Sequence, residues 1–160
     1  MEIQLLIALL LTVVPLVELR GGLPVIVDYC LKNNLSIIPY FLIVVLLNIF
    51  VIFLAYTFLE FIHIHLMKWK FYSKIFNGFV KRLRRKNENF EERFNNLGFL
   101  ALVIFVAVPL PGTGAWSGTL IAWLFGLEKK KSVAAISLGV IIAGILILLA
   151  SLGVLGFFHR

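Results

Sequence analysis

Apolar residues fill two long, uninterrupted stretches of the chain. Positions 37–59 contain no charged side chain, and positions 132–158 contain no Asp, Glu, Lys or Arg. A helix rises about 1.5 Å per residue, so either stretch is long enough to cross a hydrocarbon core of about 30 Å. The pattern therefore predicts two membrane-spanning helices. Asn48 is the one strongly polar residue of the first stretch, and we expect it to bond a neighbouring helix.

Two further apolar stretches are short or broken. Residues 3–17 would span only about 22 Å as a helix, and they contain Pro15. Residues 97–126 are interrupted between Val108 and Gly118, where two prolines and three glycines lie within eleven residues. Proline and glycine disfavour a helix interior. In lipid, irregular backbone is tolerated only where it is buried in protein or lines a cavity, and transporters bind substrates at such breaks.

The positive charges indicate how residues 97–126 meet the membrane. Eight of the fifteen Lys and Arg lie between positions 70 and 93, and three more form Lys129–Lys131. A single crossing between the two clusters would place them on opposite sides, against the positive-inside rule. A re-entrant hairpin that turns at 111–114 keeps both in the cytoplasm, because each arm of about 13 residues reaches only the middle of the bilayer. We therefore expect a re-entrant hairpin here.

The first part of the chain shows a matching design. Val14-Pro15-Leu16 recurs as Val108-Pro109-Leu110. Each is followed by a glycine-containing break, at 20–24 in the first case and at 112–114 in the second, and then by a short apolar arm and a full span. We interpret this as two inverted repeats, residues 1–59 and 97–158, an architecture typical of transporters. The predicted fold is a single all-α integral membrane domain over 1–160, with a re-entrant helical hairpin and one transmembrane helix per repeat. A first stretch that crosses as a short full span is the alternative.

Residues 60–96 form the connection between the repeats. Apolar side chains recur there at spacings of three, four and seven, and most basic side chains lie off that stripe. This is typical of an amphipathic helix at the surface of a membrane that contains anionic lipids. The net charge of +7 is thus assigned to a cytoplasmic surface and not to nucleic-acid binding. We expect a multi-pass protein of the cell membrane, with this loop in the cytoplasm and both termini outside.

Two motifs resemble the small multidrug export protein family, which is distantly similar to the DedA-like (VTT-domain) membrane proteins. They are Glu18-Leu19-Arg20-Gly21-Gly22-Leu23-Pro24 and Pro109-Leu110-Pro111-Gly112-Thr113-Gly114-Ala115-Trp116. The resemblance covers nearly the whole chain and implies two facing re-entrant hairpins and a transporter role. The DedA-like relatives are associated with proton-coupled translocation of polyprenyl-phosphate carrier lipids. The chain departs from their pattern because residues 109–118 contain no arginine.

Charged side chains near the first break supply the candidate chemistry. Glu18, Arg20 and Asp28 would each cost about 2.5–3.5 kcal/mol deep in the membrane, so we expect partners for them, with Glu18 and Arg20 pairing at the break. We also expect Pro24 in the first turn of one arm and Thr113 as the cap of the other, so that both helix N-termini point to the midplane. With an arginine added, such a site suits an anion, phosphate above all. The expected substrate-binding residues are Arg20, Gly21, Gly22, Gly112, Thr113 and Gly114, with Glu18 as the proton-coupling residue.

These features predict a transporter of an anionic lipid phosphate of the polyprenyl-phosphate type, with proton coupling as an option. Two other functions stay open: proton-coupled export of cationic drugs through Glu18, which the neighbouring Arg20 disfavours, and a membrane scaffold without transport. We expect no enzyme activity, cofactor or metal site, because no nucleophile–base set or metal-ligand cluster is apparent. The expected partners are membrane lipids and the substrate, with a homodimer as one option. We expect Trp116 and Trp123 to pack between helices or to anchor the arm.

Overall fold

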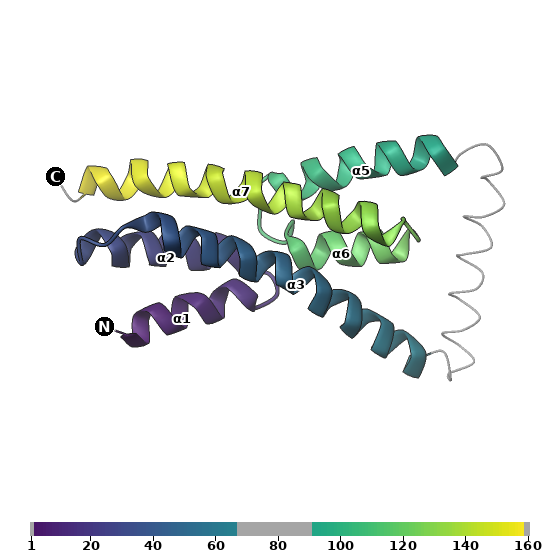
Figure 1. Cartoon of the computed structure of the whole chain (residues 1–160), viewed down its shortest axis with the longest axis horizontal. Helices are drawn as coiled ribbons and strands as arrows, with labels where there is room; N and C mark the ends of the chain where they lie inside the picture. The colour runs from purple at the N-terminus through teal and green to yellow at the C-terminus, as the bar shows by residue number, and fades with distance from the viewer. Residues whose placement is uncertain (1, 67–90, 159–160) are drawn as a thin grey trace.

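The computed structural model describes residues 2–66 and 91–158, and these form helices joined by short turns, without a strand. α1 and α2 make one helical hairpin, α5 and α6 make a second, and the long helices α3 and α7 run beside them (Figure 1). The bounds are α1 (Glu2–Val13), α2 (Glu18–Lys32), α3 (Ile37–Leu66), α5 (Glu91–Ala107), α6 (Ala115–Leu124) and α7 (Lys129–Phe158).

The two uninterrupted apolar stretches form the two long helices. α3 and α7 each contain 30 residues, about 45 Å of helix. Within them, Ile37–His63 and Lys129–Leu155 are long and apolar enough to cross a membrane, so both predicted helices are present as candidate membrane spans. Both helices extend past the predicted limits, α3 to Leu66 and α7 back to Lys129. Glu and Lys are good helix formers, so the helices continue into polar sequence.

The second broken stretch folds back on itself. A Cβ atom added to Gly98, near the start of the stretch 97–126, would lie 3.2 Å from Leu127, which follows α6. The segment therefore returns to the end of the molecule at which it begins. Lys129, the first residue of α7, pairs there with Glu60 near the end of α3, at 2.9 Å. The N- and C-terminal helix ends lie together at the opposite end (Figure 1).

The first hairpin turns earlier than predicted. The expected break at 20–24 is wrong, because α2 begins at Glu18 and contains Pro24 in its interior. The turn is formed by residues 14–17, where Leu16 adopts a φ of 74° without being glycine. Gly22 serves close packing instead, since an added Cβ would overlap the side chain of Thr12 and lie 2.7 Å from the carbonyl oxygen of Ala8 in α1.

α2 packs against α1, α3 and α7. Leu19, Leu23 and Ile26 on α2 are completely buried. On α3, the Nδ2 of the buried Asn48 donates to the carbonyl oxygen of Thr12 at 3.1 Å. The prediction that Asn48 bonds a neighbouring helix is therefore confirmed, and the bond satisfies a carbonyl near the C-terminal end of α1.

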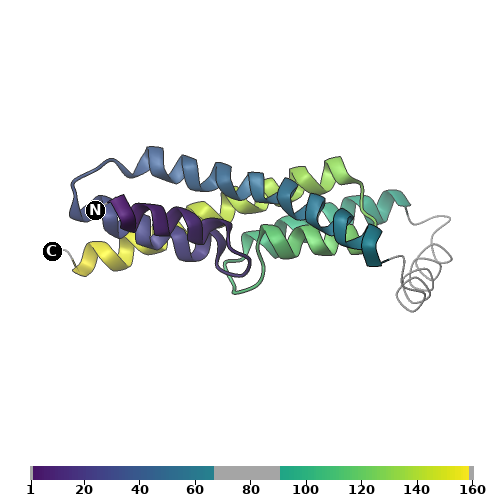
Figure 2. The same ribbon diagram turned by 90° about the horizontal axis from the view of Figure 1, so that it is seen from below.

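The turns of the two hairpins face each other near the middle of the molecule, as the second view also shows (Figure 2). Val14-Pro15-Leu16 and Val108-Pro109-Leu110 both fall in these turns. The division into repeats and the single domain remain predictions. The predicted amphipathic helix of the connection 60–96 falls mainly on 67–90, outside the described residues.

Candidate functional site

Glu18 joins the two hairpins. It is the first residue of α2 and only 2% exposed. Its Oε2 accepts the backbone N–H of Ala115 at 2.9 Å, and its Oε1 accepts that of Trp116 at 3.0 Å. These are the first two N–H groups of α6, which have no acceptor within their own helix. The carboxylate of one hairpin therefore caps the positive end of a helix in the other.

Arg20 donates to carbonyl oxygens at the C-terminal end of a helix. Its Nη1 lies 3.2 Å from Oε2 of Glu18. Its Nη2 lies within 3.2 Å of the carbonyl oxygens of Val106 and Val108, where α5 ends, and 2.7 Å and 2.9 Å from the carbonyl and hydroxyl oxygens of Thr113. The buried Nε of Arg20 has no hydrogen-bond partner within residues 2–66 and 91–158.

The predicted pairing of Glu18 with Arg20 is confirmed, and its cause is local backbone geometry. Side chains two apart on a regular helix point in different directions. Glu18, however, has a φ of 50°, in the left-handed region that non-glycine residues rarely adopt. This turns its carboxylate away from the helical direction and toward both α6 and the guanidinium.

Trp116 makes the reciprocal contact from the second hairpin. Its indole Nε1 donates to the carbonyl oxygen of Val13, the last residue of α1, at 3.1 Å. Its ring packs edge-on against Phe58 of α3, with centroids 6.0 Å apart. Trp123 lies further along α6 and packs edge-on against His63, with ring centroids 5.1 Å apart. The expectation that both tryptophans anchor α6 between helices is confirmed.

The glycines of the second turn differ in what they require. Gly114 is the N-cap residue of α6, and a Cβ there would overlap the Glu18 carboxylate. Gly112 has a φ of 82° with open space around it. Thr113 does not cap α6, so that prediction is wrong. Its hydroxyl lies 2.7 Å from the carbonyl oxygen of Val108 and is already used within the turn.

Three other predicted residues, Gly21, Gly22 and Asp28, make contacts that do not involve the Glu18–Arg20 pair. Gly21 packs against the side chain of Val17, and Gly22 faces α1. Their expected place in an irregular break is wrong, because both lie inside α2. Asp28 pairs with Lys32 at 2.7 Å, one turn further along the same helix. The structure thus brings Glu18, Arg20, Gly112, Thr113 and Gly114 together at the meeting point of the hairpins, which we call the junction.

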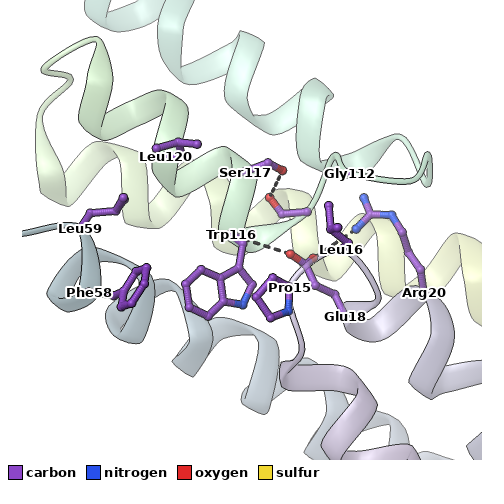
Figure 3. Close-up of a pocket in the computed structure, with 11 residues that line it drawn as sticks. Pro15, Leu16, Glu18, Arg20, Phe58, Leu59, Gly112, Trp116, Ser117 and Leu120 are labelled. Carbon is purple, nitrogen blue, oxygen red and sulfur yellow. Dashed lines mark hydrogen bonds and ion pairs between the residues drawn. The ribbon is translucent and has the colours of Figure 1, made fainter. Parts of the chain in front are cut away.

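A cavity of about 250 Å³ opens beside the junction (Figure 3). Most of the residues that line it could not be predicted from the sequence. Phe58 and Leu59 come from an unbroken apolar run, which gives no local signal of a site. Ser117 and Leu120 come from the regular part of α6. The lining residues are Pro15, Leu16, Glu18, Arg20, Phe58, Leu59, Gly112, Gly114, Trp116, Ser117 and Leu120.

Chemically, the junction is a cradle of donors around one carboxylate. Two backbone N–H groups and one guanidinium converge on Glu18. A helix N-terminus together with an arginine is a favourable setting for an anion. In the described side chains, no group of three or more His, Cys, Asp or Glu is placed to hold a metal ion.

Comparisons with known proteins give one match. A family model described as "putative small multi-drug export protein" matches residues 18–146. The matched range begins at Glu18 and contains the second hairpin and both long helices up to position 146. No curated protein and no solved structure matches the chain significantly. The wider similarity to DedA-like proteins stays a prediction.

Proposed function

The chain belongs to the small multidrug export protein family, and from that premise we propose that it is a membrane transporter that binds its substrate at the junction. We propose further that the substrate is an anionic lipid phosphate of the polyprenyl-phosphate type. One observation carries this proposal: the N–H groups of Ala115 and Trp116 and the guanidinium of Arg20 converge on a single carboxylate, that of Glu18. Donors arranged in this way select for negative charge.

Glu18 holds the cradle while no substrate is bound. A phosphate group that enters takes over the two N–H donors and the Arg20 fork, and the unpartnered Nε of Arg20 offers it one more donor. The displaced carboxylate would then be buried without partners, which is costly for a charged group. The carboxylate takes up a proton from the aqueous side and moves out of the cradle as the neutral acid. Release of the phosphate reverses the exchange, so one proton moves in step with one anion.

The proposed membrane placement follows from helix lengths. α1, α5 and α6 contain 12, 17 and 10 residues, about 18, 25 and 15 Å, and none reaches across a core of about 30 Å. Both hairpins are then re-entrant and the junction lies near the midplane. The two halves are related as inverted repeats. The caps exchanged between the hairpins support this placement, because broken helix ends in lipid need internal partners.

Export of lipophilic cations is the second candidate. The family description and the aromatic rings of Phe58 and Trp116 in the cavity favour it, since aromatic faces attract cations. In that case Glu18 would be the cation's partner. The guanidinium of Arg20, 3.2 Å from the same carboxylate, would repel a second cation, so we rank this candidate below the anion.

The test is transport in liposomes, with wild type, Arg20→Lys, Arg20→Ala and Glu18→Gln. One assay follows a labelled polyprenyl phosphate and another a lipophilic cation, each with and without a pH gradient. We expect Arg20→Lys to be partly active toward the lipid phosphate, because an ammonium keeps the charge but loses the bidentate fork. We expect Arg20→Ala to be inactive, and Glu18→Gln to bind substrate without dependence on the gradient.

Arg20 also supports the end of α5, so loss of activity needs a control for folding. Arg20→Gln retains a donor but not the charge, and its elution profile and melting temperature in detergent show whether the fold survives. A folded Arg20→Gln without lipid-phosphate transport supports the proposal. Wild-type rates in Arg20→Ala or Arg20→Gln contradict it. If Glu18→Gln abolishes cation binding while Arg20→Ala strengthens it, the cation candidate is correct.

A further inference from the structure

The cavity beside the junction has two chemically different ends (Figure 3). Glu18 and Arg20 lie at one end. Phe58, Leu59 and Leu120 lie at the other, where α3 and α6 meet. Between these ends the walls are apolar except for Ser117. A molecule that fits this shape has a charged or polar head and an apolar body.

The cavity is open to the outside of the helix bundle near both of its ends. Leu16, beside the charged pair, is 74% exposed, and at the apolar end Phe58 is 52% and Leu120 40% exposed (Figure 3). α3 is one of the two helices able to span the membrane, and exposed apolar side chains on such a helix contact hydrocarbon. The mouth formed by Leu16, Phe58 and Leu120 therefore faces lipid at the depth of the junction.

The volume decides how much of a ligand fits. The cavity holds about 250 Å³, whereas sites that enclose a drug-sized molecule hold about 300–1,000 Å³. Only a headgroup and the segment next to it can be enclosed. The rest of the ligand must extend through the mouth, and outside the mouth lies the hydrocarbon of the bilayer. A long-chain lipid meets this requirement, because its chain can extend into the bilayer. A compact drug has no such chain.

We infer that a lipid substrate reaches the junction sideways from the bilayer, with its headgroup at Arg20 and its hydrocarbon chain passing out between Leu16, Phe58 and Leu120. The phosphate head of this lipid rests on the proposed function, whereas the lateral opening rests on the geometry of the mouth. Only the headgroup has to leave the interface, so the protein never encloses the chain.

Photoreactive lipids test the path of the chain. Two probes carry the same diazirine-bearing chain, one with a phosphate head and one with a neutral head, and adducts are mapped by mass spectrometry in proteoliposomes. We expect the phosphate probe to label Phe58, Leu59 and Leu120, and excess unlabelled lipid phosphate to remove these adducts. Labelling spread evenly over exposed positions such as Leu46 and Leu149, without displacement by excess lipid, would overturn the inference.

The two probes separate this inference from the proposed function. Saturable labelling of the mouth by the neutral probe alone would support the lateral opening and contradict a phosphate substrate. Transport of lipid phosphate in liposomes without labelling of the mouth would support the function and overturn the lateral path.

A block of the mouth gives a second measurement. Leu16→Trp enlarges an exposed side chain at the opening, and Leu46→Trp makes the same change at a position of α3 that is 64% exposed and does not line the cavity. We expect lipid flux to fall about tenfold in Leu16→Trp, which corresponds to roughly 1.4 kcal/mol, and to stay at the wild-type rate in Leu46→Trp. Equal flux in both variants would contradict the lateral path.

Discussion

Glu18 and Arg20 have two tasks that are difficult to separate. Each neutralises the other and also satisfies backbone groups where helices end in the interior. In hydrocarbon such groups have no water as a hydrogen-bond partner. In the proposed mechanism, the contacts that hold the hairpins together also keep the anion site filled while no substrate is bound. A substrate would have to compete with Glu18 for these donors, and its binding would change how the hairpins are joined.

Truncation of Glu18 should separate its charge from its role as an acceptor. Glu18→Ala leaves two N–H groups without their acceptor and Arg20 without its ion-pair partner, and breaking a buried ion pair typically costs about 3–5 kcal/mol. Glu18→Gln keeps an oxygen acceptor and should lose less. The melting temperature in detergent should therefore fall in the order wild type, Glu18→Gln, Glu18→Ala. Equal melting temperatures for the two variants would show that the N–H caps contribute nothing.

Gly114→Ala should disrupt the same cap from the opposite hairpin. The added Cβ falls on the Glu18 carboxylate, so the two elements must separate or the side chain must leave. Gly153→Ala is the matched control, because nothing lies within 4 Å of that position on α7 and alanine favours a helix. We expect lower transport and stability for Gly114→Ala alone.

A double variant checks the cause. In the Glu18→Ala background, Gly114→Ala should add little further destabilisation, since residues in contact are non-additive. Full additivity of the two losses would contradict the assigned contact.

Three helix ends meet at the junction, those of α1, α5 and α6, and each is bonded by a side chain from another helix. Glu18 caps α6, Arg20 supports the end of α5, and Trp116 together with Asn48 supports the end of α1. Separation of the hairpins would break the bonds that Glu18, Arg20 and Trp116 make between them. In the proposed mechanism, the junction therefore couples the relative position of the two hairpins to the state of the Glu18 carboxylate.

Trp116→Phe tests the coupling at α1. The ring contact with Phe58 is preserved in kind, but the indole N–H is lost and the carbonyl of Val13 is left without its donor. An unsatisfied buried group costs about 1–3 kcal/mol. Phe58→Leu is the control, because it removes the ring contact while the indole N–H of Trp116 still donates to Val13. A melting temperature that falls in Phe58→Leu but not in Trp116→Phe would assign the effect to packing instead.

Periodicity and the positions of proline and glycine predicted the long helices and the broken stretches, but not where the first turn lies. Glycine and proline at 20–24 suggested a break, yet Gly22 is used for helix contact with α1 and Pro24 is accommodated within α2. The turn at Leu16 has no glycine to reveal it. Glu18 and Arg20 were found as intramembrane charges, whereas their partners are backbone atoms some ninety residues away, which no local pattern encodes.

At the scale of the whole molecule, the two hairpins and two long helices place both termini at one end (Figure 1). The basic residues of α7 lie at the other end, where Lys129 meets Glu60. The positive-inside rule then assigns that second end to the cytoplasm.

Cysteine labelling tests this topology. In a background with Cys30→Ser, Lys130→Cys and Lys81→Cys should both react with a membrane-impermeant reagent only from the cytoplasm. A Glu2→Cys variant should react only from outside. Labelling of position 130 from outside, with position 81 labelled from the cytoplasm, would contradict the re-entrant second hairpin.

We propose that the Glu18 carboxylate occupies the site of the substrate anion and is displaced by it with uptake of a proton. Proton uptake on binding measures this directly. A short-chain polyprenyl phosphate is added to the purified protein in weakly buffered detergent solution, and the bound protons are counted for wild type and Glu18→Gln. The phosphate's own titration is common to both, so the difference isolates Glu18. We predict about one additional proton per bound anion in wild type, with binding that strengthens as pH falls. Equal proton uptake in the two proteins would show that Glu18 is not the group that the anion displaces and that takes up the proton.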